Sequence, residues 1–383
     1  MHLLTSQMDF YDAIRPLHFV SKLSGVTVFS INSKTLKPQV KVNDFLMIVA
    51  TIIISYYLNH QFWGLFSTKS YYLHSHLLKI IFPFLVYGKF IINLIAMVWS
   101  FFARVKIATI VEKITEIDDL FQQFMKLQID FEYRHMRRKT VIYIGLIAVL
   151  EAVLISVSYY TEKIYVKTTS ALVWMVIFWN VNTLTMFLSQ RRLTAINDHL
   201  KNTSVIHLHD LKLISRIHLK LTETIDVMNT SYCIMMMFFL TGAFCLLNVF
   251  LYCLKVLIAI SNYEFFIIFS GKILLNMYSL ILTMYVVFIA NRTSQQARRT
   301  TRILFDILHS ADYDNEFTTQ VLNFVGQISN SQTLFSCGLL NFDFKLFFKF
   351  ISATVMYLVI LIQFDINYND DVAIGNLTLS NDF

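Results

Sequence analysis

The side chains of this sequence that are best suited to chemistry are polar and ionisable groups inside long apolar stretches. Lys89 and Asn93 lie in one stretch, Glu151 in a second, and Lys272 and Asn276 in a third. If these stretches cross a membrane, a charge near the centre costs roughly 2.5–3.5 kcal/mol, so it should face a partner or a wet cavity. Two interpretations stay open: Glu151 neutralises one of the lysines within a helix bundle, or these groups line a ligand pocket.

The pocket interpretation includes aromatic residues near the same polar groups. Small-molecule sites are mostly apolar and aromatic, with a few polar side chains that orient the ligand. Aromatic residues near helix ends also serve as anchors at the membrane surface, which is the alternative for each of them. The residues expected to bind a ligand are Tyr87, Lys89, Glu151, Tyr159, Trp174, Phe178, Lys272 and Asn276.

Motifs of known enzyme chemistry are missing from the sequence. It contains no HExxH, GxSxG, GxxxxGK[ST] or CxxC pattern, so the common metal, nucleophile and phosphate sites have no candidate. His207 and His209 are two residues apart and do not share a helix face, and the four cysteines lack metal-ligand spacing. We therefore expect no enzyme activity, no cofactor and no metal site.

Composition places the chain among membrane proteins. Hydrophobic residues make up 56% of it and charged residues 15%, whereas soluble domains carry about 25% charge. The sequence contains 35 Phe but only nine Gly and three Pro, which is typical of long apolar helices rather than of turns and sheets. The net charge of +7 is attributed to cytoplasmic loops facing anionic lipid, so membrane lipid is an expected partner and nucleic acid is not.

The apolar stretches are long enough to span a bilayer, which takes about 20 residues of helix. We predict an all-α protein of the plasma membrane with seven transmembrane helices, at 45–63, 77–101, 141–160, 170–190, 232–254, 265–290 and 346–364.

Loop charge predicts the orientation of these spans. The segments 1–44, 102–140, 191–231 and 291–344 carry 23 Lys and Arg, and the segments on the other side carry four. Because Lys and Arg stay where translocation is not required, the side with 23 is cytoplasmic. The N-terminus is then inside and the C-terminus outside, and Asn376, in an Asn-Leu-Thr sequon, is an expected glycosylation site.

The inner loops are long and patterned. Over 101–130, isoleucine and phenylalanine recur at steps of three and four residues, which is typical of one face of a helix that leaves the membrane. We expect a cytoplasmic helical layer. The predicted organisation is an inner N-terminal segment (1–44), a seven-helix domain (45–364) with inner extensions at about 101–140, 191–231 and 291–343, and an outer tail (365–383).

The last span carries an apolar face of its own. In a single chain this is a packing face; in a symmetric oligomer, copies around an axis would form an apolar constriction that gates by dewetting. The expected pore and gate residues are Phe347, Ile351, Thr354, Val355, Leu358 and Ile362.

Two segments of the sequence resemble the insect gustatory receptor family. LSQRRLTAINDHL (188–200) looks like the arginine and asparagine patch that follows span four in that family. The family's C-terminal signature reads Thr-Tyr, five hydrophobic residues and Gln-Phe, and Met356 stands here in place of the Thr. The matching residues are Phe335-Ser336, Gly338-Leu339, Tyr357, the LVILI that follows it, and Gln363-Phe364.

The resemblance implies a ligand-gated, non-selective cation channel related to insect odorant receptors. Such channels are tetramers in which span seven lines a central pore and the cytoplasmic ends of spans four to seven join the subunits. Each subunit holds its ligand in the outer half of its own bundle. Carried onto this chain, Phe347 and Ile351 lie near the gate, and Tyr357, Gln363 and Phe364 lie toward the outer mouth.

The function expected from the sequence is thus a taste receptor channel. Its partners would be a small-molecule tastant, permeating cations, and further copies in a homotetramer or other receptors in a hetero-oligomer. Alternatives are an odorant-type receptor subunit, a seven-helix receptor coupled to a G protein, and, least favoured, a transporter that uses the buried Lys and Glu as a relay.

Overall fold

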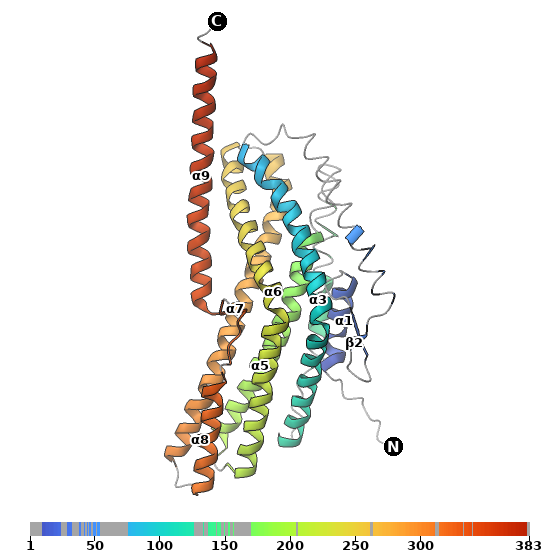
Figure 1. Ribbon diagram of the computed structural model, residues 1–383, viewed down its shortest axis with the longest axis vertical. Coiled ribbons are helices and arrows are strands. Elements are labelled where there is room, and N and C mark those ends of the chain that lie inside the picture. The colour runs from blue at the N-terminus through green and yellow to red at the C-terminus, as the bar shows by residue number, and fades with distance from the viewer. Residues whose placement is uncertain are drawn as a thin grey trace.

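The structure is a computed structural model, drawn in Figure 1. It describes residues 10–23, 29–32, 38–39, 76–125, 170–203, 206–260, 263–310, 314–331, 333–338 and 340–380, with scattered residues at 42–53 and 133–156. At 76–90, 170–183, 256–276 and 365–380, and at scattered positions, the description covers little more than the backbone.

Long helices that run roughly along one direction make up most of the described chain (Figure 1). Two strands of two residues each, β1 (Ser30–Ile31) and β2 (Pro38–Gln39), form an antiparallel pair. The helices are α1 (Phe10–Leu23), α3 (His76–Met125), α5 (Ser170–Asn202), α6 (Leu208–Ile260), α7 (Tyr263–Ser310), α8 (Asn315–Asn330) and α9 (Phe344–Ser380).

Five predicted spans coincide with parts of these helices: 77–101 with α3, 170–190 with α5, 232–254 with α6, 265–290 with α7 and 346–364 with α9. The other two, at 45–63 and 141–160, lie mostly outside the described residues. Among the described residues, two segments contain an apolar stretch that is long enough to cross a membrane by length and composition, Leu208–Cys245 and Phe344–Phe364.

Several helices are far longer than a bilayer is thick. The 50 residues of α3 would extend about 75 Å at 1.5 Å per residue, against about 30 Å of hydrocarbon. Its last part has the periodic face seen in the sequence, and Ile110, Ile114, Ile117 and Phe121 on that face are buried to 1% exposure or less. Burial of each such side chain contributes about 1.5–3 kcal/mol, which explains why the helix continues past the apolar stretch.

The buried side chains form two cores along the bundle. The first joins α1, β1 and the middle of α3 to α5, α6, α7 and the segment before α9. The second, which we call the inner layer, joins the lower ends of α3, α5, α6 and α7 to α8, and includes Leu193, Ile214, Leu304 and Phe324. The pairs α5–α7 and α3–α6 make the most extensive contacts.

Helix α9 lies on one side of the bundle, against α6 and α7 (Figure 1). It continues to Ser380 and so passes through residues predicted to form an outer tail; Asn376 lies in its last part, where the backbone alone is described.

Candidate functional site

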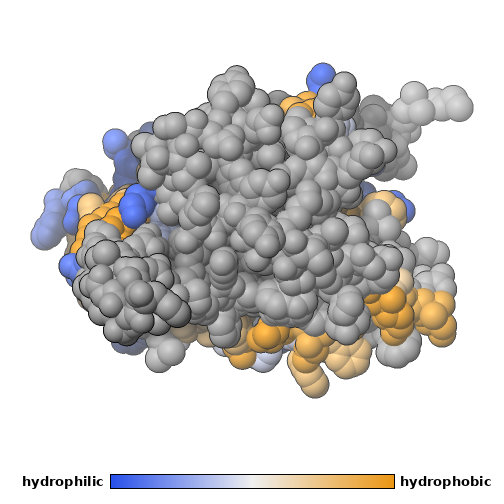
Figure 2. All heavy atoms as spheres, turned by 90° about the horizontal axis from the view of Figure 1, so that it is seen from above, coloured by the Kyte–Doolittle hydropathy of each residue, from blue (hydrophilic) through white to orange (hydrophobic). Residues whose placement is uncertain are grey.

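The outward face of α9 is a continuous apolar stripe. Phe344, Phe348, Ile351, Val355 and Val359 follow one another at steps of three or four residues, and their exposed fractions lie between 43% and 66%. Figure 2, an end-on view, shows hydrophobic side chains projecting at the rim of the molecule. Such a contiguous face indicates a contact with lipid or with another protein surface.

The structure divides the six expected gate residues between this stripe and the bundle. Ile351 and Val355 belong to the stripe, whereas Phe347 packs partly against the first core. Thr354 is buried, and its Oγ1 donates to the carbonyl of Phe350 at 2.9 Å. The remaining two, at the border between the faces, are half-buried: Leu358 and Ile362.

The signature residues of α9 are all exposed on its surface: Tyr357, Gln363 and Phe364. The ring of Tyr357 stands edge-on to Phe244 of α6, with the centroids 5.5 Å apart. Phe244 makes the same type of contact with Phe350, about two turns earlier on α9. Edge-to-face ring pairs contribute about 0.5–1.5 kcal/mol beyond area burial, so this aromatic group fastens α9 to α6.

A tight turn before α9 is fastened to α6 by one side chain. Asn229 Nδ2 donates to the carbonyl of Leu334 at 2.7 Å, and the Ser336 N–H donates to Asn229 Oδ1 at 3.1 Å. Gly338 has a φ of 73°, which glycine adopts without strain. The Asp343 carboxylate then accepts from the Leu346 N–H at 2.9 Å and caps α9. This geometry gives a reason for the Phe335-Ser336 and Gly338 positions of the motif.

The eight expected ligand-binding side chains are not among those that the structure describes. Glu151 and Tyr159 lie outside the described residues. The other six lie on described helical backbone without a described side chain: Tyr87, Lys89, Trp174, Phe178, Lys272 and Asn276.

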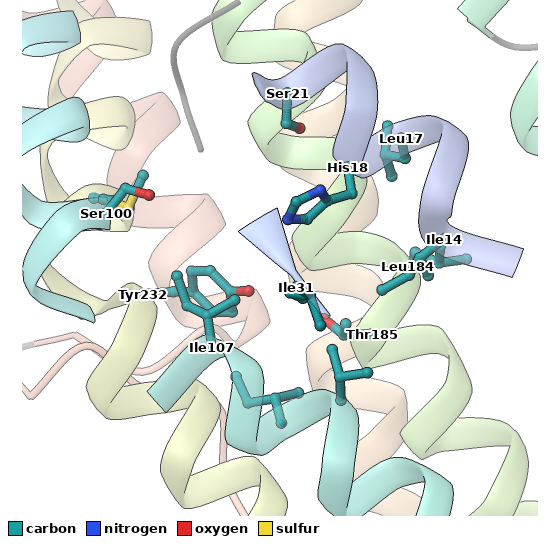
Figure 3. A pocket seen from close by; sticks show the side chains of 13 residues that line it. Ile14, Leu17, His18, Ser21, Ile31, Ser100, Ile107, Leu184, Thr185 and Tyr232 are labelled. Carbon is teal, nitrogen blue, oxygen red and sulfur yellow. The ribbon is translucent and has the colours of Figure 1, made fainter. Parts of the chain in front are cut away.

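A cavity that sequence reasoning missed lies between α1, β1, α3, α5 and α6 (Figure 3). Its volume is about 60 Å³, enough for a few water molecules, and most of its lining is apolar. Polar groups around it include His18, Ser21, Thr185 and Tyr232. Burial lowers the pKa of His18 to about 4, with a further lowering by Lys22, so the imidazole is neutral.

The N-terminal helix is fastened over this cavity by a charged group. Lys22 forms an ion pair with Asp44, and its Nζ also donates to Ser30 Oγ at 2.7 Å. Ser30 Oγ in turn donates to Asp44 Oδ2 at 3.2 Å. The network links α1 to β1 and to the residues that precede the first predicted span.

The arginine patch that follows the predicted fourth span supplies a buried charge network. Arg192 is fully buried; its Nε and Nη2 donate to Asp118 Oδ1 at 2.8 and 2.6 Å, and Nη2 also donates to the Tyr133 hydroxyl at 2.7 Å. The Tyr133 hydroxyl donates to Asp118 Oδ2. Burial raises the pKa of Tyr133, which therefore stays protonated and able to donate.

The asparagine of the same patch joins α5 to α7. Asn197 Nδ2 donates to the backbone carbonyl and the side-chain Oε1 of Gln296 at 2.9 and 3.0 Å, and Thr300 Oγ1 donates to Asn197 Oδ1 at 2.7 Å. Arg192 and Asn197, the arginine and the asparagine of this patch, thus join the helices of the inner layer.

The family model of the 7tm chemosensory receptor matches residues 14–368, nearly the whole chain. The chain belongs to the 7tm chemosensory receptor family. Among solved structures, this chemosensory receptor is similar to the insect olfactory receptor OR5 from Machilis hrabei, with a TM-score of 0.61, 12% identity, and coverage of 91% of this chain and 97% of that one. The same receptor in complex with eugenol gives a TM-score of 0.59 at 12% identity and the same coverage.

Comparison with curated protein sequences found no significant match. At 12% identity the structural likeness concerns the fold of this chemosensory receptor. The family and the fold together make it a membrane receptor of helical architecture. The resemblance to insect gustatory receptors in the C-terminal motif is confirmed at the level of the chemosensory receptor family.

Proposed function

We propose that this chemosensory receptor is a taste receptor that acts as a ligand-gated, non-selective cation channel in the plasma membrane. A small molecule binds in the outer half of the helix bundle, and its preference for the open arrangement shifts an existing equilibrium toward conduction. Membership of the chemosensory receptor family carries the proposal, and the gustatory assignment rests on the Tyr357 to Phe364 signature.

The proposed topology has seven spans, the N-terminus in the cytoplasm and the C-terminus outside. The 23 to 4 division of Lys and Arg between the two sides supports it. The inner layer then lies in the cytoplasm, where ion pairs such as Lys113–Glu223 and Lys212–Glu316 are exposed to water.

The proposed pore is lined by α9 from each of four subunits. The apolar stripe of Phe344, Phe348, Ile351, Val355 and Val359 supports this, since it lies on the side of α9 turned away from its own bundle. Four copies around an axis would place a ring of Ile351 and Val355 side chains in a narrow passage, where apolar walls expel water and stop ions.

Whole-cell recording of the chain expressed alone tests the channel. Ligand-evoked cation current is expected from a panel that includes sugars, bitter compounds, amines and eugenol. If eugenol is the only compound of the panel that evokes current, an odorant-type receptor is favoured. Silence across the panel, with surface expression confirmed by labelling, would contradict a channel that works by itself.

Tag accessibility tests the topology independently of ligand. On intact cells a C-terminal tag should be stained and an N-terminal tag only after permeabilisation. Staining of the N-terminal tag on intact cells would exclude the proposed orientation and favour a G-protein-coupled layout. Glu151→Gln tests the transporter alternative, which requires that substrate flux changes with this residue.

A further inference from the structure

An open cleft of about 920 Å³ lies in the inner layer, where the end of α5 meets the lower part of α7. Four cationic side chains line it, from both helices: Lys201, Arg298, Arg299 and Arg302. Asp306 is the single acidic residue of the lining, which leaves a large excess of positive charge in one concave surface.

Other cations of the inner layer form ion pairs with carboxylates, and among the described residues these four do not. Lys113, Lys212 and Lys220 each form an ion pair with a glutamate of a neighbouring helix. Within the described part of the chain, none of the four cleft cations lies within 4.0 Å of a carboxylate oxygen. Four cations and one carboxylate in a single lining leave an excess of positive charge, so the cleft favours an anionic occupant.

The wall of the cleft is held in place by buried hydrogen bonds. The Asn197 side chain joins Gln296 and Thr300, so that α5 and α7 are fixed relative to each other at this point. Gln295 adds to the lining a neutral side-chain amide that can donate hydrogen bonds. A cationic surface carried on two fastened helices loses little conformational entropy when it binds.

The cleft lies a short distance beyond the apolar part of α7. That helix is unbroken from Tyr263 to Ser310, and Arg292 is the first cation after its predicted span. Arg298 and Arg302 follow six and ten residues later, about 9–15 Å further along the axis at 1.5 Å per residue. In the orientation proposed above, the cleft therefore faces the cytoplasm just beneath the lipid headgroups.

We propose that this cleft binds a phosphate-bearing polyanion. Arginine suits this chemistry because its planar guanidinium donates two parallel hydrogen bonds to phosphate oxygens. The polyanion has two possible sources with the same chemistry: the headgroup of a polyphosphoinositide of the inner leaflet, or a soluble inositol polyphosphate. Occupancy would neutralise the repulsion between Arg298, Arg299 and Arg302 and strengthen the α5–α7 junction.

Binding is measured on the purified full-length chain, without recourse to channel current. The lipid arm uses nanodiscs of phosphatidylcholine with fluorescent phosphatidylinositol bisphosphate, against nanodiscs with phosphatidylserine at matched charge. The soluble arm uses inositol hexakisphosphate in nanodiscs of phosphatidylcholine alone. Saturable binding is expected in at least one arm, and the arm that responds identifies the source.

The decisive variant is Arg298→Gln/Arg302→Gln. Each basic residue near an anionic surface contributes about 1 kcal/mol, so the loss of two should weaken binding about thirtyfold. The matched control is Lys345→Gln/Lys349→Gln, which removes the same charge from exposed positions at the start of α9 and should change affinity by less than about threefold.

Two results would overturn the proposal. One is equal weakening by the two double variants, because that would indicate general attraction to anionic surfaces rather than a site. The other is an unchanged affinity in Arg298→Gln/Arg302→Gln, because the cations of the cleft would then not hold the polyanion; a changed subunit number in the same variant would identify the cleft as a contact with a second copy of the chain. Neither result depends on whether the chain conducts ions, so failure here is distinct from failure of the proposed channel.

Discussion

The guanidinium of Arg192 donates two hydrogen bonds to a single oxygen of Asp118, from Nε at 2.8 Å and from Nη2 at 2.6 Å. The arginine is fully buried and the carboxylate nearly so. Removal of one partner from such a pair leaves an uncompensated charge in the interior, whereas removal of both does not. Because Arg192 belongs to α5 and Asp118 to α3, the pair joins these two helices.

Asp118→Ala should destabilise the receptor by about 3–5 kcal/mol, the usual cost of breaking a buried ion pair. The measurement is thermal unfolding of the purified protein in detergent. Glu223→Ala is the control, because the Lys113–Glu223 pair is exposed to solvent and should contribute about 0–1 kcal/mol. The double variant Asp118→Leu/Arg192→Met should recover most of the loss; if it is as unstable as Asp118→Ala, the uncompensated charge is not the cause.

Ile351→Ala should raise the resting current of the proposed channel while leaving its thermal stability unchanged. The side chain is 43% exposed on the outward stripe of α9, so its truncation widens the proposed constriction without opening a cavity in the bundle. Phe347→Ala should lower stability as well, because Phe347 packs against the first core. Basal conductance and unfolding temperature are measured together for each variant.

Met356→Ala is the control for the gate, since Met356 is also exposed, at 60%, but lies outside the stripe of α9. It should leave the resting current at the level of the unmodified chain. A rise in resting current as large as that of Ile351→Ala would mean that truncation anywhere on α9 opens the channel. The stripe would then not be the gate.

Gly338→Ala should hinder the turn that joins α8 to α9. Its φ of 73° costs a residue with a Cβ roughly 1–2 kcal/mol, although no atom would clash with that Cβ. Gly326→Ala is the matched control, because Gly326 lies inside α8 with free space around it and alanine favours a helix by about 1 kcal/mol. The two substitutions should therefore shift the unfolding temperature in opposite directions, and shifts of the same sign would contradict this account.

The long helices could be predicted from the sequence because they depend on local properties. Apolar length predicted the spans that coincide with α3, α5, α6, α7 and α9, and the isoleucine periodicity over 101–130 predicted the buried face of α3. Each signal is carried by residues close to one another in the chain, so one sequence suffices to read it.

The tertiary partnerships could not be predicted in the same way. The Arg192 patch was conspicuous, yet its partner Asp118 lies 74 positions away on another helix, and Asn229 lies 107 positions from Ser336. The cavity beside α1 depends on five elements that meet only in the folded chain. The sequence pattern of α9 likewise does not show which of its apolar side chains are covered by its own bundle, as Phe347 is in part, and which stay exposed, as Ile351 does.

Acid should weaken the inner layer through His218. This imidazole is fully buried on α6, with its ring edge-on to Phe324 of α8 at 5.5 Å between centroids. Burial lowers its pKa to about 4 from 6.5, so the folded state takes up a proton less readily than the unfolded state. Its contribution to stability is therefore fully present above pH 6.5 and is lost as the pH falls toward 4, by about 1.4 kcal/mol for each pH unit.

His218→Leu should make unfolding in urea less sensitive to pH in that window, because leucine has no proton to gain. Part of the dependence should remain, since the pKa of His18 is lowered to about 4 as well. His209→Gln is the control: the His209 side chain is 88% exposed, so its removal should leave the pH dependence as it is. If His218→Leu and the unmodified chain lose stability in parallel between pH 6.5 and 4, proton uptake by this buried imidazole does not contribute to acid unfolding.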